Sequence, residues 1–246
     1  MQYLGPSFDL KTLMKTSKVS EHTQQHLSKV YTSLMATVFA AFVGASMCMR
    51  MEEFPPSVAA MGAFGGLFVM IAMSCIDKSK TSLRTALMIG FGFLEGVSLT
   101  PLLKLAVVVD ERIIATAFLG TASIFLCFSL AALTSKRRSF LYLGGILGST
   151  LTILILSSLI NMFLGSALLF NLELYVGLAV FVGYILFDTQ VIIEAAEKGN
   201  DDYVWHAMKL FIDLVGIFIR ILIILIKMNQ KKQSSSNRSS SFESVV

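Results

Sequence analysis

Long apolar blocks, separated by short polar stretches, constrain this chain more than any other feature of its sequence. A helix needs roughly 20 apolar residues to cross about 30 Å of hydrocarbon. Inside lipid only helices and closed barrels satisfy their backbone polar groups, and barrel strands alternate apolar and polar residues. The blocks show no such alternation, so each is expected to be helical: 30–49, 56–76, 84–103, 113–133, 140–160, 168–193 and 207–228.

The composition excludes an ordinary soluble domain. Of the 246 residues, 55% are hydrophobic and only 15% are charged, whereas soluble domains carry about 25% charged residues. We therefore expect an all-α integral membrane protein: a cytosolic segment 1–29, a seven-helix membrane domain 30–228 and a disordered serine-rich tail 229–246. The net charge of +4 comes from loops and tails beside the lipid bilayer, so no nucleic-acid partner is expected.

Lysine and arginine counts in the connections predict the orientation. Cytosolic connections carry an excess of both residues. The N-terminal segment, the connection after the second block and the connection after the fourth block are rich in them, and the intervening connections are poorer. The N-terminus is therefore expected in the cytosol. Block 207–228 is long enough for a seventh span, but the basic tail behind it also fits a re-entrant segment that returns to the cytosol.

Four ionisable residues fall inside the apolar blocks, where charges are costly and usually functional. They are Glu95, Asp188, Asp213 and Arg220. At about 1.5 Å rise per residue, both aspartates lie roughly 8–9 Å below the cytosolic surface. Antiparallel neighbouring helices could bring the two carboxyl groups together at that depth.

Two carboxyl groups that meet in a low dielectric cannot both ionise cheaply, so the pair would share a proton. Such a pair is a pH-responsive gate, closed while it holds the proton and loosened by repulsion when both groups ionise. Paired carboxylates also suit calcium, which takes oxygen ligands, so Asp188 and Asp213 are candidates for transient calcium contact. The alternative is two separate aspartates, each hydrogen-bonded to a neighbouring helix.

The other two charges allow two interpretations each. Arg220 lies seven residues after Asp213, on the same helical face. It could balance the aspartates through water or extend its side chain toward the far side of the membrane. Glu95 could line an ion path, or it could be protonated and bonded to a helix backbone.

Histidines and glycines give weaker signals. His22 and His26 lie four apart, which fits a juxtamembrane helix better than half a zinc site. His206 is expected to anchor its helix at the membrane interface, and the acidic loop 194–202 is expected to be solvated. Glycines four apart allow helix backbones to pack closely: Gly62 and Gly66, Gly92 and Gly96, and Gly144 and Gly148.

Several motifs together resemble the Bax inhibitor-1 family over about residues 20 to 230. Its signature is similar to Gly96–Pro101 followed by Ala117–Ala122. Its C-terminal half is similar to Phe187–Gln190, Asp202–His206 and Phe211–Asp213. The chain departs from the family at three places: it has no basic residue within 56–76, Thr100 precedes Pro101 where glycine is usual, and no dilysine ends the tail.

The resemblance implies a seven-helix bundle whose last helix is central, and a pH-sensitive calcium leak across the endoplasmic reticulum membrane. The family's paired aspartates correspond to Asp188 and Asp213, and calcium would be the transported ion with no cofactor. The family's role is the suppression of stress-induced cell death, with contacts to Bcl-2-type proteins and stress sensors. Other endomembranes or the plasma membrane stay open as locations.

Two rival functions follow from the same residues. A regulator without transport would act by binding other membrane proteins. An intramembrane aspartyl protease also needs two membrane aspartates, but its Gly-x-Gly-Asp motif does not precede Asp188 or Asp213. The short connections disfavour a seven-helix receptor. We therefore expect no enzyme.

Overall fold

The computed structural model describes residues 20–135 and 140–243, and every regular element in these ranges is a helix. The elements are α2 (Glu21–Met49), α3 (Pro56–Cys75), α4 (Thr81–Val109), α5 (Arg112–Thr134), α6 (Leu143–Leu164), α7 (Ala167–Glu197) and α8 (Tyr203–Glu243). Most of the expected N-terminal segment and the basic connection 136–138, on which the orientation partly relied, lie outside the described residues.

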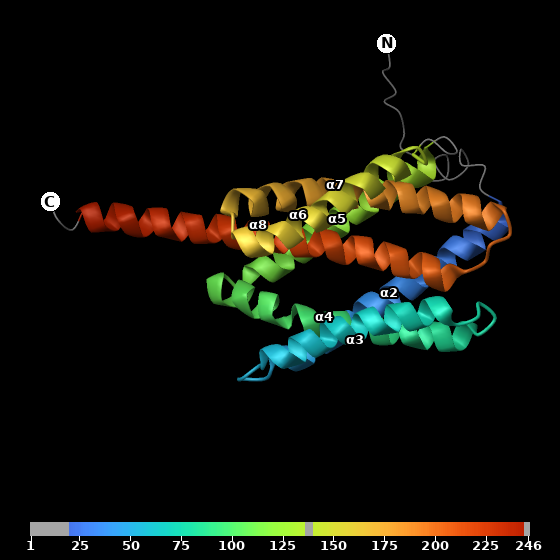
Figure 1. The fold of residues 1–246 in the computed structure, drawn as a ribbon, viewed down its shortest axis with the longest axis horizontal. Helices are drawn as coiled ribbons and strands as arrows, with labels where there is room; N and C mark the ends of the chain where they lie inside the picture. Colours follow the sequence, from blue (N-terminus) through green and yellow to red (C-terminus); the bar gives the residue numbers. More distant parts are fainter. Residues whose placement is uncertain (1–19, 136–139, 244–246) are drawn as a thin grey trace, which may run out of the picture.

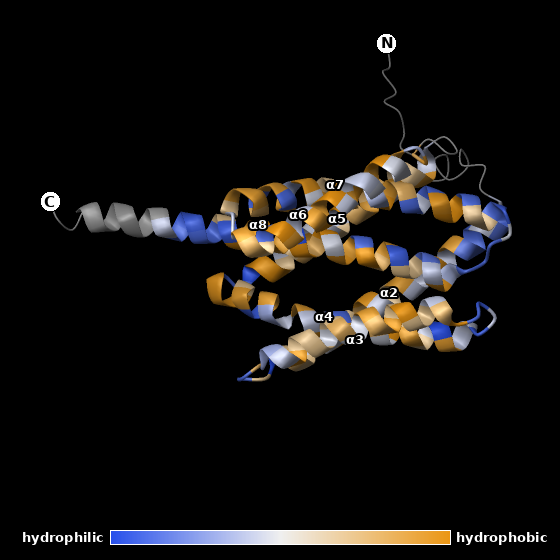
Figure 2. Ribbon diagram, in the orientation of Figure 1, coloured by the Kyte–Doolittle hydropathy of each residue, from blue (hydrophilic) through white to orange (hydrophobic). Residues whose placement is uncertain are grey.

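Six of these helices, α2 to α7, are long and apolar enough to cross a membrane. Their outward faces carry large apolar side chains, such as Phe39, Phe64, Phe68 and Phe163, which are more than half exposed. Figure 2 shows polar residues gathered at the loops and along the part of α8 that first leaves the bundle. The prediction of an all-helical protein is thus confirmed for the described residues, and six of the seven blocks form helices long and apolar enough to span a membrane.

Local sequence explains where the helices begin and turn. The Ser20 hydroxyl accepts a hydrogen bond from the Thr23 amide at 3.2 Å and so caps α2. Gly165 ends α6 in the left-handed region at φ 60°, which glycine adopts without strain. Ser166 follows at once and caps α7. This two-residue turn makes α6 and α7 antiparallel neighbours.

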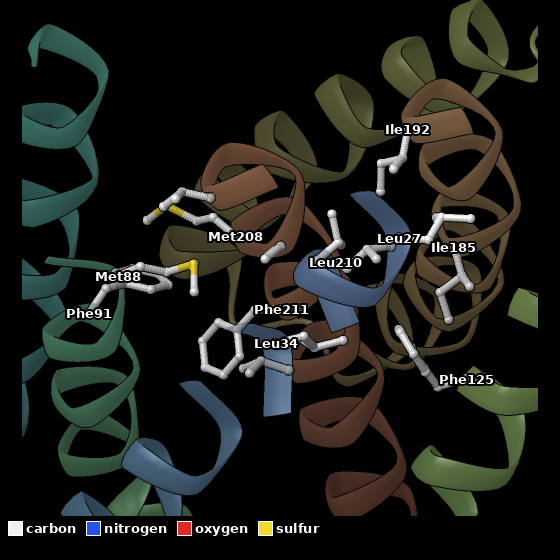
Figure 3. Packing of buried hydrophobic residues seen from close by; sticks show 14 of the residues in the cluster. Leu27, Leu34, Met88, Phe91, Phe125, Ile185, Ile192, Met208, Leu210 and Phe211 are labelled. Atoms are coloured by element: carbon white, nitrogen blue, oxygen red, sulfur yellow. The ribbon is translucent and has the colours of Figure 1, made fainter. Parts of the chain in front are cut away.

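The buried core gathers around the first half of α8, which packs against α2, α4, α5 and α7. Figure 3 shows side chains of these four helices around Phe211 and Leu210 of α8. The Phe91 and Phe211 rings meet edge to face, with their centroids 5.7 Å apart. Apolar contact around α8 therefore fixes its position in the bundle.

The helix α8 is continuous from Tyr203 to Glu243 and shows no reversal of the chain, so it does not fold as a re-entrant pair of segments. It continues past residue 228, where the expected seventh block ends, and projects beyond the other helices (Figure 1). A helix that packs against no neighbour is only marginally stable in water. The disorder expected for the tail 229–246 therefore stays a prediction.

Helices α2 and α4 approach each other closely at glycines. A Cβ on Gly92 would lie 2.5 Å from the Thr37 carbonyl oxygen, and one on Gly96 would clash with the Ala41 carbonyl oxygen. On the other face of α4, a Cβ on Gly62 of α3 would lie 2.9 Å from the Leu94 oxygen. The glycine spacing noted in the sequence thus serves packing within the chain at these two interfaces.

We expect Gly96→Ala to lower the free energy of unfolding in detergent micelles by about 1–3 kcal/mol, because α2 and α4 have to separate. Gly90→Ala on the same helix is the matched control, since nothing lies within 4 Å of its Cβ position. It should be neutral or stabilising by up to about 1 kcal/mol. Equal stability of the two variants would contradict the close approach.

Candidate functional site: a buried carboxyl pair between α7 and α8

Asp188 on α7 and Asp213 on α8 lie side by side in the interior of the bundle. Their exposed fractions are 5% and 4%, and their carboxyl groups lie close enough to interact directly. Two carboxylates cannot hydrogen-bond each other unless one carries a proton, because an ionised carboxylate only accepts. A direct hydrogen bond between these two groups would therefore need one of them to carry a proton.

The chain brings the two aspartates together through the antiparallel arrangement of α7 and α8. Asp188 lies nine residues before the end of α7 at Glu197, and Asp213 lies ten residues after the start of α8 at Tyr203. Equal rise along both helices places the carboxyl groups at nearly the same depth. Depth is thus set by sequence spacing, whereas the facing of the two side chains is set by packing around α8.

Lysine 209 is a member of the site that sequence reasoning missed. Its Nζ lies 3.9 Å from Oδ1 of Asp188, and its side chain is 37% exposed. It precedes Asp213 by four residues, a spacing that places both side chains on one face of α8. A pair with one shared proton carries a single negative charge, so Lys209 makes the group neutral in that state. Loss of the proton leaves one negative charge in excess.

One oxygen of the pair is left over. Oδ2 of Asp213 is buried and has no hydrogen-bond partner in the part of the chain that the structure describes. A buried acceptor without a partner is costly.

Arg220 does not reach the carboxyl pair. Its Cζ lies 4.4 Å from the centre of the Phe181 ring, and its Nη1 donates a hydrogen bond of 2.9 Å to the Gly216 carbonyl oxygen. The side chain thus packs against α7 two turns beyond the pair. It forms no ion pair within ranges 20–135 and 140–243.

Glu95 also lies apart from the pair. It is partly buried on α4, where its Oε2 is 3.7 Å from the position of a Cβ on Gly66 of α3. This places Glu95 at the α3–α4 interface, away from the contact between α7 and α8 that holds the carboxyl pair. The structure therefore brings together two of the four buried charges and keeps the other two separate.

The end of the bundle that carries the α7–α8 loop holds a second buried polar group. His26 Nε2 and His206 Nδ1 are 2.9 Å apart, with one ring donating and the other accepting. Both histidines are 4% exposed, so His206 is a core contact to α2 rather than the interfacial anchor expected from the sequence. His22 lies 3.3 Å from the exposed Asp201.

An ion pair beside these histidines ties the loop to α4. Arg84 Nη1 lies 2.7 Å from Oδ1 of Asp202, and the two side chains are only 5% and 6% exposed. The same oxygen accepts from the Trp205 amide and caps the start of α8. The acidic loop is therefore not wholly solvated, because Asp202 is buried in an ion pair.

The described residues contain no group of three or more histidine, cysteine, aspartate or glutamate side chains that could hold a metal ion. The carboxyl pair by itself offers two ligand groups. Calcium binding takes six to eight oxygen ligands, so contact of calcium with Asp188 and Asp213 stays a prediction.

Comparison with known proteins gives consistent matches over nearly the whole chain. The family model described as "Inhibitor of apoptosis-promoting Bax1" matches residues 23–231. The human protein named Bax inhibitor 1 is 43% identical over 240 residues, which cover 97% of this chain and 100% of that protein. Bax inhibitor 1 of Arabidopsis thaliana is 40% identical over 92% of this chain and 91% of its own length. The matched range 23–231 spans the positions of Asp188 and Asp213.

The buried Arg84–Asp202 ion pair makes a stability prediction. Asp202→Ala should lower the free energy of unfolding by about 3–5 kcal/mol, because it leaves a buried guanidinium without its anion. Asp201→Ala is the matched control one residue away, where the side chain is 63% exposed, and its effect should stay below about 1 kcal/mol. Equal unfolding midpoints for the two variants in detergent would argue against the pair.

Proposed function

Because this chain belongs to the Bax inhibitor-1 family, we propose that it is a pH-sensitive calcium leak channel that suppresses stress-induced cell death. The shared names of its relatives support the role in cell death. The buried contact between Asp188 and Asp213 supports the leak and its dependence on pH. We propose the endoplasmic reticulum membrane as its location, with the N-terminus in the cytosol.

The proposed topology has seven spans with α8 at the centre. The helix α8 is in contact with α2, α4, α5 and α7, and its residues Met208, Leu210, Phe211 and Ile217 are almost fully buried. Charged residues can cross a membrane where other helices surround them. The charges of α8 lie against α7, which explains how a segment too polar to resemble an ordinary span could still cross.

The proposed gate is the carboxyl pair itself. With one shared proton, the hydrogen bond between Asp188 and Asp213 holds α7 against α8. When both groups ionise, two charges about 4 Å apart repel by about 4 kcal/mol at an effective dielectric constant of about 20. This repulsion loosens the contact, and the ionised oxygens then suit a calcium ion. Calcium flux should therefore be low in acid and rise as the pH increases.

A second candidate is a regulator that binds Bcl-2-type proteins or stress sensors and transports nothing. The description of the family as an inhibitor of apoptosis-promoting Bax favours it, since those words name an effect on a protein. They name no catalysed reaction, and we propose no enzymatic activity. Purified protein that shows no calcium flux, yet protects cells, would select this candidate over the leak.

The leak predicts a specific effect of Asp213→Asn in proteoliposomes loaded with a calcium indicator. The amide can still bond Asp188 but cannot ionise, so the repulsion that opens the gate is lost. Flux at alkaline pH should fall by at least about tenfold, which a barrier change of about 1.4 kcal/mol suffices to produce. Its pH dependence should disappear.

Glu111→Gln is the control for this measurement, because it removes an exposed carboxylate at the start of α5. Its flux should match that of the unaltered protein at every pH. Glu95→Gln tests the carboxyl group at the α3–α4 interface. Because Glu95 lies apart from the carboxyl pair, this variant should keep the pH dependence. An Asp213→Asn variant whose flux and pH dependence are both unchanged would show the gate to be wrong.

A further inference from the structure

Three charged residues follow one another along α8 at a spacing of seven: Asp213, Arg220 and Lys227. Seven residues are close to two helical turns, so the three side chains leave α8 on the same face, about 10 Å apart in height. Each contacts α7: Asp213 meets Asp188, Arg220 meets Phe181, and Lys227 meets Asn171. Along its contact with α7, the α7–α8 seam, helix α8 therefore places one acidic side chain, Asp213, followed by two basic side chains, Arg220 and Lys227.

The guanidinium of Arg220 sits in a cradle formed by Gly177 and Phe181 of α7. A Cβ on Gly177 of α7 would lie 2.8 Å from Nη2 of Arg220 and would be closer still to its Nε. In return, a Cβ on Gly216 of α8 would lie 2.6 Å from two carbons of the Phe181 ring. Each helix thus offers a glycine one turn before a large side chain, and the two helices interlock.

This cradle holds a positive charge without neutralising it. The contacts of Arg220 are an aromatic face and a carbonyl oxygen of its own helix, both uncharged. Its Nε is buried and has no hydrogen-bond partner among the residues described. A guanidinium cannot shed its proton in a protein, so the seam keeps a fixed positive charge two turns from the carboxyl pair.

Lys227, seven residues after Arg220, is a second basic side chain whose partners are neutral. Its Nζ donates to Oδ1 of Asn171 at 2.6 Å and lies 4.2 Å from the centre of the Phe170 ring. Both partners are neutral, so this charge is not cancelled by an acid either. It is exposed, however, and water screens it more strongly than it screens Arg220.

We propose that Arg220, held over Phe181 by the Gly177 cradle, is the electrostatic barrier that limits cation flow along the α7–α8 seam. This inference rests on the proposed calcium leak and identifies the residue that keeps the flow small. A fixed cation repels a divalent ion twice as strongly as a monovalent one at the same distance. Fixed arginines restrict cations in this way in other narrow pores.

The test measures calcium and potassium flux in proteoliposomes for three variants. Arg220→Gln removes the charge and keeps a polar side chain, and it should raise calcium flux by about tenfold. Potassium flux should rise less, because the barrier acts more weakly on a monovalent ion. The pH dependence should persist, since the carboxyl pair is untouched.

Arg220→Lys keeps the charge but loses the flat stack on Phe181, so its calcium flux should stay close to that of the unaltered protein. Gly177→Ala keeps the charge as well and only shifts the guanidinium, so its calcium flux should rise much less than that of Arg220→Gln. Arg112→Gln, an exposed arginine at the start of α5, is the control and should change nothing.

The outcomes separate this inference from the function on which it rests. If the unaltered protein conducts calcium with the expected pH dependence and Arg220→Gln matches it, the barrier is overturned and the leak survives. If Arg220→Gln and Arg220→Lys raise both ions equally, the residue is only a packing element, and the barrier is again overturned. If no variant conducts calcium at any pH, the leak and the barrier fall together.

Discussion

A carboxyl group in a low-dielectric interior is stable only with a proton or a partner, and the contact between Asp188 and Asp213 supplies both at once. The contact requires α7 and α8 to be antiparallel, in register and turned toward each other. Lys209 balances the one remaining charge at a distance of 3.9 Å. A shared proton would therefore add a polar contact between α7 and α8 to the apolar packing that positions α8.

The carboxyl pair lies between two sets of contacts that hold α8 in place. On one side, His206 and the loop residue Asp202 bind His26 of α2 and Arg84 of α4. On the other side, Arg220 and the glycine cradle interlock α8 with α7. The proposed opening at the carboxyl pair would therefore be a local separation of α7 from α8 between these two sets of contacts.

Sequence spacing predicted that Asp188 and Asp213 lie at matching heights along their helices, because helical rise is nearly constant in every helix. Their depth below the cytosolic surface stays a prediction. Sequence spacing could not predict that the two side chains face each other, since the rotation of a helix depends on packing from distant segments. For the same reason it missed the His26–His206 contact, whose partners lie 180 residues apart. The burial of Asp202 escaped it too, because the partner Arg84 belongs to another helix.

Other features had a signal in the sequence that was not specific enough. Lys209 lies four residues before Asp213, yet that spacing alone does not say whether the lysine points toward α7. Gly177 and Gly216 are ordinary glycines in apolar blocks, and only the facing helices reveal the cradle. The seventh block was expected to end at residue 228 because apolar residues end there, whereas backbone hydrogen bonds continue α8 to Glu243.

The most direct test of the account is infrared spectroscopy of the carboxyl groups, recorded over a pH series together with calcium flux from the same proteoliposomes. The account predicts a protonated-carboxyl band that is lost in Asp213→Asn and that disappears in the unaltered protein over the pH range in which flux rises. A band that persists while flux rises, or a flux that rises with no change in the band, would contradict it.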